Sequence, residues 1–431
     1  MVTFESFGRI ERRARASVSF GEAERRMPQG GPYLAYGNGL SYGDSCYNDA
    51  GVLVEMRPLG RIIGFDAVSG ILEAEAGVLL ADIIAVAAPH GFFLPVTPGT
   101  RFVTLGGAIA NDVHGKNHHR RGTFGCHVVS FALLRSDGIL RTCSPQENPA
   151  LFAATIGGMG LTGLIVTARI QLMRVPSLDI EERVTAFSDL DEFFALAEEA
   201  DRENEYAVAW IDQLAKAGRG LLLTGNHASN GNFHADTRPA RLGVPLELPF
   251  SALNRPSLKL FNAAYYRRKG RDAGPHLSDY ARFFYPLDAV KRWNRLYGPA
   301  GLYQHQSVIP EAQARQTIPA MLEATRRAGQ ASFLTVLKRF GSVRSPGLLS
   351  FPQAGYTLTL DFPNRGESTL ALLAELDRLT VMAGGRVNPY KDQRMPAAVF
   401  AASFPQWEEL EKLRDPAFCS NFWQRTALSL V

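Results

Sequence analysis

Residues 98–119 read PGTRFVTLGGAIANDVHGKNHH, and the order of residue types in this stretch decides the fold. A Pro-Gly turn leads through the adjacent pair Gly106 and Gly107 into a group of cationic and amide side chains, namely His114, Lys116, Asn117, His118 and His119. Glycines leave the backbone bare, so that another group lies close against it. Bare backbone followed by cationic groups favours a loop that binds a large, flat cofactor carrying phosphate.

Three other interpretations of this stretch were considered. A P-loop is excluded, because Ala110 stands where its first glycine belongs and Asn117, rather than Ser or Thr, follows Lys116. A zinc site made from the histidines would require a helix, which Gly115 opposes, and the chain has no CxxC or HExxH pattern. We therefore expect no bound metal. A solvated basic turn stays open on this stretch alone.

Composition places the chain among folded globular proteins. Its 431 residues predict two or three domains, and its contents of 46% apolar and 20% charged residues argue against disorder. A formal net charge of +4 does not suggest a nucleic-acid partner. The four cysteines are widely spaced, which favours a reducing compartment. Because the sequence shows neither the apolar core of a signal peptide nor a membrane-spanning run, we expect a cytoplasmic protein.

Local patterns divide the chain into two regions of different character. The first 175 residues or so contain short strands at 52–56, 61–66 and 71–76, a helix at 79–91, and a hairpin turning at Asp137-Gly138. This mixture predicts an α+β region with many short strands.

After residue 176, strands alternate with longer helices, which predicts a mixed or antiparallel sheet covered by helices. The helices are expected at 187–201, 311–328 and 367–383. Residues 231–273 show no clear period and are rich in Pro, Arg and large apolar residues. They predict a functional loop or a disordered segment.

A second glycine cluster, YGNGLSYGD at residues 36–44, changes the interpretation of the first one. Alone it would be an ordinary glycine-rich connection. Two such clusters about 60 residues apart, each following a short strand, favour nests of backbone N–H groups around a pyrophosphate. With GGMGLTGLI at 157–165 and YKDQR at 390–394, the chain resembles flavoenzymes of the vanillyl-alcohol oxidase type. Within that group it resembles the decaprenylphosphoryl-β-D-ribose 2-oxidase family.

The resemblance implies an α+β fold in which residues 1–177 form a two-part FAD-binding domain. Residues 178–385 would form the substrate domain, and 386–431 would return to the FAD domain. FAD would be bound non-covalently, because the first cluster contains no histidine. The implied FAD contacts are Gly37, Asn38, Gly39, Leu40, Ser41, Tyr42, Gly43, Asp44, Gly99, Thr104, Leu105, Gly106, Gly107, Asn111, Asp112, Val113, His114, Asn117 and Ile165.

The resemblance also implies which residues act on the substrate. Lys391 would be the functional lysine, as a base or as a stabilising charge, with His114 and Tyr42 beside it. The implied substrate-binding residues are Lys338, Gln304, Gln306, Thr357, Thr359, Asn388 and Lys116. Asp392 and Arg394 would fix the loop. Mycobacterial members of the family have a cysteine in place of Thr359 and a tyrosine in place of Asn388, so that this pocket is more polar. Tyr390 is a possible source of the missing aromatic ring.

The implied reaction oxidises the 2-hydroxyl of a polyprenyl-phosphoryl-β-D-ribofuranose to the 2-keto compound. This is the first half of an epimerisation to the arabinofuranose donor, which a short-chain dehydrogenase/reductase partner would complete. Two alternatives stay open: an oxidase of a free alditol, sugar or aldonolactone, and a flavin-binding protein without catalysis.

Residues 241–271 interleave large apolar side chains with Arg255, Lys259, Arg267, Arg268, Lys269 and Arg271. Such a mixture suits the surface of an anionic membrane. We therefore expect peripheral membrane contact, and the alternatives are a lid over the pocket or a contact with another subunit.

Overall fold

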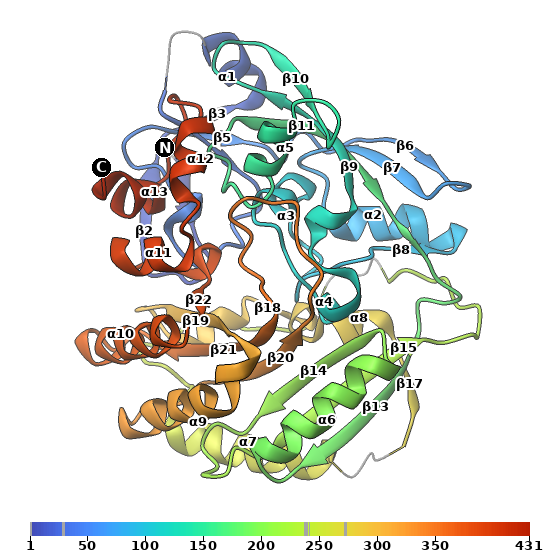
Figure 1. The fold of residues 1–431 in the computed structure, drawn as a ribbon, viewed down its shortest axis with the longest axis vertical. Helices are drawn as coiled ribbons and strands as arrows, with labels where there is room; N and C mark the ends of the chain where they lie inside the picture. Colours follow the sequence, from blue (N-terminus) through green and yellow to red (C-terminus); the bar gives the residue numbers. More distant parts are fainter. Residues whose placement is uncertain (1, 28–30, 237–239, 241, 271–273) are drawn as a thin grey trace.

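The computed structural model describes the chain except residues 1, 28–30, 237–239, 241 and 271–273. Figure 1 shows two parts stacked along the long axis, with several small sheets in the upper part and one large sheet in the lower part. The upper part contains the N-terminal residues and also the C-terminal helices.

The upper part is built on two main sheets. The first is a parallel sheet in the order β3 (Ser17–Ser19), β5 (Val52–Glu55) and β4 (Tyr33–Tyr36). The second is antiparallel, in the order β10 (Leu140–Cys143), β9 (Val128–Leu134), β11 (Leu164–Gln171), β7 (Ile71–Glu75) and β6 (Ile62–Asp66). The helices here are α1 (Phe20–Arg26), α2 (Leu80–Ala87), α3 (Leu105–Ala110), α4 (His118–Arg121) and α5 (Pro149–Thr155). The predicted strands, hairpin and helix of this region are confirmed.

The lower part is one antiparallel sheet, eight strands wide within the described residues. Its order is β17 (His276–Ser278), β13 (Ile180–Phe187), β15 (Gly220–His227), β14 (Tyr206–Ile211), β20 (Val336–Phe340), β21 (Gly355–Pro363), β19 (Leu302–Ile309) and β22 (Arg386–Val387). Its helices include α6 (Leu190–Glu203), α9 (Glu311–Arg327) and α10 (Glu367–Met382), close to their predicted positions. These three helices cover one face of the sheet. The predicted α+β fold with a helix-covered sheet is confirmed.

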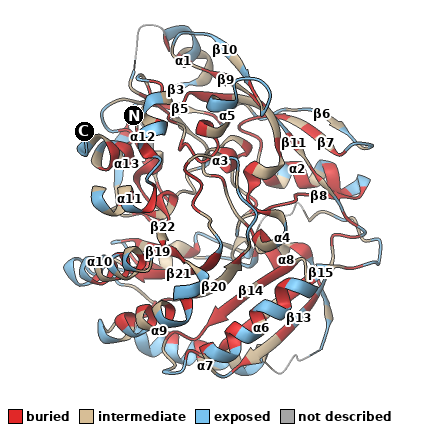
Figure 2. Ribbon diagram, viewed as in Figure 1, coloured by how far each residue is buried: buried red, intermediate tan, exposed pale blue. Residues whose placement is uncertain are grey.

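Strand β21 explains why the two faces of this sheet differ. Its sequence YTLTLDF alternates, so that Leu358 and Leu360 enter the apolar core beneath the helices. The side chains between them, Thr357, Thr359 and Asp361, lie on the opposite face. Figure 2 shows the buried residues concentrated in the strands and the exposed ones on the outer sides of the helices. One strand therefore contributes apolar side chains to the core on one face of the sheet and polar side chains to the other face.

The prediction of an irregular segment at 231–273 is wrong for its central part, which forms α7 (Arg255–Lys269). Asn254 caps this helix in a reciprocal capping box with Ser257. Only Leu258 and Asn262 of the helix are fully buried, so that the sequence shows too few apolar positions to reveal the helical period. Residues 237–239, 241 and 271–273, including the predicted Arg271, lie outside the described residues.

Shorter elements complete the described chain. The short strands are β1 (Val2–Glu5), β2 (Arg12–Arg15), β8 (Phe92–Phe93), β12 (Met173–Arg174), β16 (Leu242–Gly243) and β18 (Val290–Lys291). The remaining helices are α8 (Tyr280–Phe284), α11 (Ala397–Ser403), α12 (Trp407–Leu413) and α13 (Asn421–Arg425). No helix in the described part of the chain is long and apolar enough to cross a membrane.

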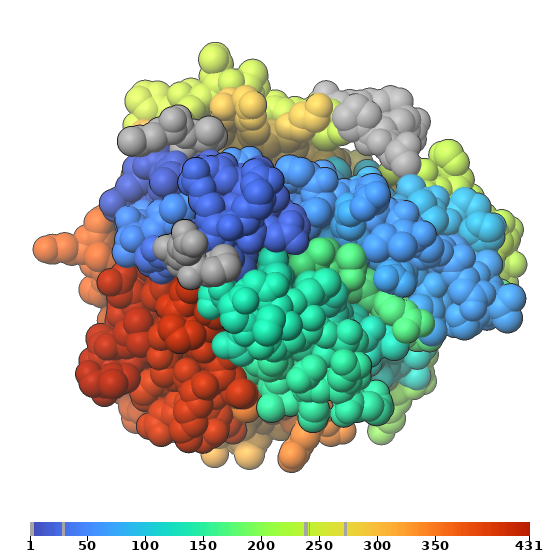
Figure 3. Space-filling model, turned by 90° about the horizontal axis from the view of Figure 1, so that it is seen from above, coloured from blue at the N-terminus to red at the C-terminus, as the bar shows by residue number. Residues whose placement is uncertain are grey.

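The C-terminal helices lie against the upper part. Figure 3 shows the red C-terminal segment side by side with the blue N-terminal and teal segments on the upper face. Asp415 accepts hydrogen bonds from Arg135 and Ser136, which directly precede the β9–β10 turn. These contacts tie the C-terminal helices to the upper part, whereas β22 at residues 386–387 still belongs to the lower sheet. The predicted boundaries at 177 and 385 remain a proposal.

Candidate active site

The two glycine clusters meet in space. The side-chain amide of Asn38 donates a hydrogen bond of 2.8 Å to the carbonyl of Phe102. A Cβ atom at Gly37 would lie only 2.6 Å from the hydroxyl of Thr104, so that this contact requires glycine. The two clusters therefore contact each other, although about 60 residues separate them.

The first cluster presents free backbone donors. No backbone N–H group of residues 37–43 donates a hydrogen bond to any described residue. Six of these seven residues keep at least partial exposure. Unpaired N–H groups of this kind suit the oxygens of a pyrophosphate. This observation fits a phosphate-bearing cofactor.

The second cluster differs from the prediction of a donor nest. The N–H groups of Leu105 and Gly106 donate to carbonyls of Val78 and Ala76, and that of Gly107 donates to the Thr104 hydroxyl. The first two of these bonds anchor the start of α3 to the residues that follow β7. The N–H groups of Gly106 and Gly107 are therefore not free to bind a phosphate. What these glycines offer is the absence of a side chain, which lets another group lie close to the backbone.

Several other predicted cofactor residues have side chains that hold the loops in place. Buried Asp112 accepts hydrogen bonds from Ser345, Ser350 and Gly125. The amide of Asn117 donates to Pro95 and Glu205, that of Asn111 donates to Gly107, and Asp44 pairs with Arg425. Ile165 and Leu105 are buried in the apolar core. The side chains of Asn111, Asp112 and Asn117 therefore hold the loops through contacts within the protein.

The remaining predicted cofactor residues lie along the two loops. The carbonyls of Ser41 and Tyr42 accept hydrogen bonds from Phe7 and Gly8, which hold the first loop. A Cβ atom at Gly99 would meet no atom within 4 Å. Gly39, Leu40 and Val113 are partly exposed. Gly39 has a φ of +63°, and a Cβ atom there would lie 2.2 Å from the Tyr36 hydroxyl.

The polar face of the large sheet carries the predicted substrate residues. Gln304 lies opposite Asp361, Gln306 opposite Thr359, and Lys338 opposite Thr357 in the strand register. Gln306 is the centre of this face. Its amide donates to the Thr357 hydroxyl at 3.0 Å and contacts His114 Nε2 at 3.1 Å, and its oxygen accepts from Asn388 at 2.9 Å.

His114 and Lys338 form the next contact, with 3.5 Å between Nδ1 and Nζ. Burial, together with the charges of Lys391 and Lys116, lowers the pKa of Lys338 to about 7. Burial and the nearby lysines also hold the pKa of His114 well below its usual value. His114 is therefore neutral at neutral pH.

Lys391 lies in the short helix η7 (Pro389–Lys391), with its Nζ 5.3 Å from the centre of the Tyr42 ring. Burial lowers the pKa of Lys391 to about 8, against an opposing effect of the Asp361 carboxylate. Burial raises the pKa of Asp361 to about 7, although Gln304 donates to it at 2.5 Å. The sequence analysis did not single out Asp361. The alternation of YTLTLDF, which places it beside Thr357 and Thr359, was the available signal.

Lys116 lies apart from this hydrogen-bonded group. Its ammonium donates to the carbonyl of Phe283 and lies 4.3 Å from the centre of that ring. Burial lowers its pKa to about 8. Lys116 thus contributes charge to the site but, among the described residues, makes no hydrogen bond to another predicted substrate residue.

The loop that carries Lys391 is locked to the first glycine cluster. Asp392 accepts from the backbone of Arg394 and from the side chain of Arg425, which also pairs with Asp44. A Cβ at Gly43 would lie 1.6 Å from the carbonyl oxygen of Asp392. Asp392 and Arg394 therefore have the loop-fixing contacts that we expected.

Tyr390 does not supply the aromatic ring that Asn388 lacks. Its hydroxyl donates toward the carbonyls of Gly157 and Leu349, and its side chain is buried. Asn388 stays within the polar group through its bond to Gln306.

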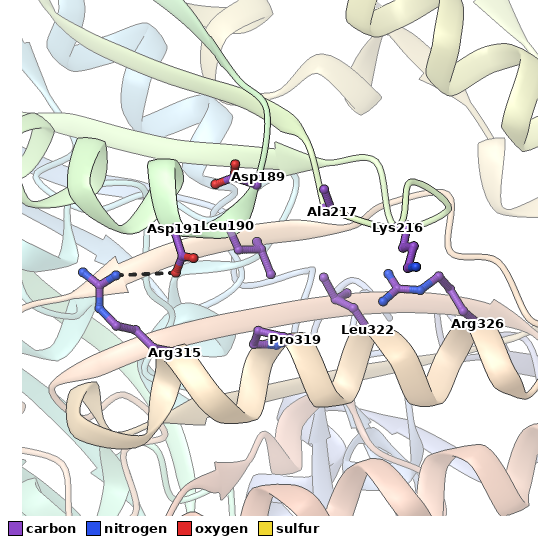
Figure 4. A pocket seen from close by; sticks show the side chains of 10 residues that line it. Asp189, Leu190, Asp191, Lys216, Ala217, Arg315, Pro319, Leu322 and Arg326 are labelled. Carbon is purple, nitrogen blue, oxygen red and sulfur yellow. Dashed lines mark ion pairs between the residues drawn. The ribbon is translucent and has the colours of Figure 1, made fainter.

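A cavity of about 230 Å³ lies elsewhere in the molecule, and Figure 4 shows the side chains that line it. It lies between the start of α6 and helix α9, where Arg315 approaches Asp191 at 3.9 Å. It belongs to the helix-covered side of the sheet and contains none of the predicted site residues.

Comparison with known proteins agrees with this geometry. Residues 26–144, which contain both glycine clusters, match a family model described as an FAD binding domain. The decaprenylphosphoryl-β-D-ribose oxidase of Mycolicibacterium smegmatis is 34% identical over 413 residues, which cover 92% of this chain and 89% of that protein. The chain belongs to the vanillyl-alcohol oxidase-type family of FAD-binding oxidoreductases. The match to an FAD binding domain supports FAD as the cofactor.

Other relatives of this oxidoreductase differ in how much they share. An uncharacterised protein of Streptomyces coelicolor is 33% identical over 81% of this chain and 99% of its own length. The L-gulonolactone oxidase of Bos taurus is 30% identical over 146 residues, about a third of each chain.

Proposed function

We propose that the protein oxidises the 2-hydroxyl of a polyprenyl-phosphoryl-β-D-ribofuranose to a ketone. The observation that carries this proposal is the polar face next to the glycine clusters, where Lys391, Lys338 and Asp361 all titrate near neutrality. Perturbed titratable groups of this kind gather at catalytic sites. The likeness to the mycobacterial oxidase over most of the chain supports the substrate.

Bound FAD supplies a hydride acceptor for the carbon that bears the hydroxyl. The chain itself has to remove the hydroxyl proton and orient the sugar. In its neutral form, Lys391 accepts that proton. The Nζ atom of Lys391 faces the Tyr42 ring. A pKa of about 8 keeps a useful fraction of the amine neutral at physiological pH.

Lys338, His114 and Gln306 hold the sugar hydroxyls and the phosphate. Lys338 has a lowered pKa because it is buried beside other cations. An anionic phosphate nearby would raise that pKa again and keep Lys338 charged. Substrate binding should therefore take up a proton close to pH 7.

FAD is bound non-covalently in this proposal. The first glycine cluster has no histidine. The other candidate for a covalent link, His114, directs its ring nitrogens to Gln306 and Lys338. A short-chain dehydrogenase/reductase would then reduce the ketone from the opposite face and complete the epimerisation.

The main alternative is an oxidase of a free alditol, sugar or aldonolactone, which the partial likeness to L-gulonolactone oxidase favours. That likeness covers about a third of the chain. A flavin-binding protein without catalysis is disfavoured by the three groups that titrate near neutrality.

The test is anaerobic bleaching of the flavin absorbance. A polyprenyl-phosphoryl-ribose should bleach it rapidly, whereas free ribose, alditols and L-gulono-1,4-lactone should not. Bleaching by the free compounds alone would establish the alternative substrate class. No bleaching by any of them would leave a flavin-binding protein.

A further inference from the structure

Helix α7 and the segment before it expose large apolar side chains to solvent. We call residues 242–270 the α7 surface. Leu246 and Leu260 are 76% and 75% exposed, and Phe250 is 62% exposed. Leu242, Leu248 and Phe261 are exposed as well. A group of exposed apolar side chains in a folded protein indicates a surface that binds another molecule or a membrane.

The charge of the α7 surface is strongly positive. Its sequence contains five cations, Arg255, Lys259, Arg267, Arg268 and Lys269, and one carboxylate, Glu247. Glu247 is neutralised by Arg9 and Arg12 at 2.8 and 3.0 Å. Among the described residues, only Lys269 of the five cations has an ion-pair partner, Glu182 at 4.0 Å. The other four cations remain available to an anionic partner.

The helix is anchored, so these side chains stay on the outside. Leu258 is buried, and the amide of Asn262 donates to Asp212 at 2.8 Å. Leu260, Ala264 and Arg268 follow at intervals of four residues and share the outer face. An anchored helix with an apolar and basic outer face differs from a lid, whose apolar side would turn inward over the pocket.

A row of aromatic rings connects this surface with Lys391. Phe261, at the surface, lies 5.4 Å from Phe333 between ring centres. The row continues through Phe333–Trp293 at 6.3 Å, Trp293–Phe7 at 5.3 Å and Phe7–Tyr42 at 5.1 Å. Tyr42 is the ring beside Lys391. The apolar surface and the candidate active site are thus joined by apolar groups.

We propose that the α7 surface docks on an anionic lipid bilayer, and that the aromatic row behind it guides an apolar chain from the bilayer to Lys391. The docking stands on the exposed and charged residues alone, whereas the guiding role rests on the proposed function. Basic side chains are attracted to anionic headgroups, and exposed Leu and Phe enter the interface. Each basic residue strengthens binding about fivefold.

Docking is tested by flotation of the FAD-loaded protein with vesicles, in low and high salt. Wild type should float with vesicles that contain phosphatidylglycerol and stay behind with pure phosphatidylcholine. Leu260→Glu with Phe261→Glu, and Arg267→Glu with Arg268→Glu, should each weaken binding at least tenfold. The matched control is Ile63→Glu with Val68→Glu, two residues 51% and 89% exposed at the β6–β7 hairpin, which should bind as wild type does.

Flavin absorbance and the thermal unfolding midpoint show whether each variant is folded. Equal binding by wild type and both α7 variants, or binding by none, would overturn the docking. A dimer in solution that the Leu260 and Phe261 changes dissociate would assign the surface to a second copy instead.

The guiding role needs a second measurement. The Arg267→Glu, Arg268→Glu variant should oxidise a short-chain prenyl-phosphoryl-ribose in solution at the wild-type rate and lose at least tenfold on a long-chain substrate in vesicles. Equal losses on both substrates would refute guidance. If wild type floats but oxidises neither substrate, the proposed function fails and the docking stands.

Discussion

Lys391, Lys338 and Asp361 titrate close to neutrality because the fold removes water from all three. Two cations and one carboxylate respond in opposite directions, so that the lysine pKa values fall to about 8 and about 7 while the carboxyl pKa rises to about 7. Each group is therefore able to change its charge when the substrate arrives. This convergence underlies the predictions for single residues.

Lys391→Ala should retain FAD and lose flavin reduction by about 10²- to 10⁴-fold, the usual contribution of a positioned acid–base group. In wild type, reduction should accelerate as pH rises through about 8, because the neutral amine accepts the proton. Anaerobic stopped-flow absorbance measures both effects. Lys412→Ala, an exposed lysine on α12, is the control. A rate that falls over this pH range would assign the charged form of Lys391 to catalysis.

Asp361→Asn should move the pH profile of flavin reduction to lower pH. The Asp361 carboxylate raises the pKa of Lys391, so that its removal lowers that pKa and makes the neutral amine available sooner. Asp361→Glu, which keeps the charge, should leave the profile closer to wild type. An unchanged profile in the asparagine variant would show that the two groups do not interact in solution.

Thr359 should leave the protein unreactive toward thiol-directed covalent inhibitors at this position, where the resemblance implies a cysteine in mycobacterial members. A hydroxyl lacks the reactivity of a thiolate, so that intact-mass spectrometry should find no adduct on wild type. Thr359→Cys should gain one adduct, located by peptide mapping. Cys143, whose pKa burial raises to about 11, serves as an internal control for a buried thiol. An adduct on Thr359 itself would contradict the expectation.

Among the elements, strand β21 shows what local sequence patterns predict, and helix α7 shows what they miss. The alternation in β21 and the periods of α6, α9 and α10 are local signals, and they predict those elements closely. Helix α7 buries too few residues to show a period. Contacts across the fold, such as Gln306 with His114, 192 residues apart, have no signal in either segment alone. The resemblance to a family identified Gln306 and His114 as site residues. Placing Asp361 at the site required the strand register.

The contact between the two glycine clusters predicts a defect in cofactor binding. Gly37→Ala would bring a Cβ within 2.6 Å of the Thr104 hydroxyl and push the loops apart. Overpacking of this kind costs about 1–3 kcal/mol, which corresponds to roughly tenfold weaker FAD binding or more. Titration of the FAD-stripped protein with FAD, followed by flavin fluorescence, measures the affinity. Gly64→Ala, where no atom lies within 4 Å, should bind FAD as wild type does. Equal affinity in both variants would refute a tight loop contact.

At the scale of the whole molecule, the candidate site lies between the upper sheets and the polar face of the lower sheet. The upper part supplies the free backbone donors of residues 37–43, and the lower sheet supplies Lys338 and Asp361. A cofactor held between them should stabilise both parts against unfolding.

Purified protein should therefore be yellow, and acid precipitation should release FAD into the supernatant. Adding FAD to stripped protein should raise the thermal unfolding midpoint, because a ligand that binds only the native state stabilises it. Absorbance of supernatant and pellet, with scanning calorimetry, provides the measurement. Flavin that stays in the pellet would contradict non-covalent binding. His114 would then be the candidate for the covalent link.

The Arg425 side chain joins the first glycine cluster to the loop of Lys391, through a bond to Asp44 that spans 381 positions of the chain. During synthesis the ribosome delivers residues in order, and the earlier part of a chain begins to fold first. The strands around residues 37–43 are thus present long before Arg425 has been made. Capture of FAD in its final geometry belongs to the last steps of biogenesis, when newly made Arg425 ties the two ends of the site together.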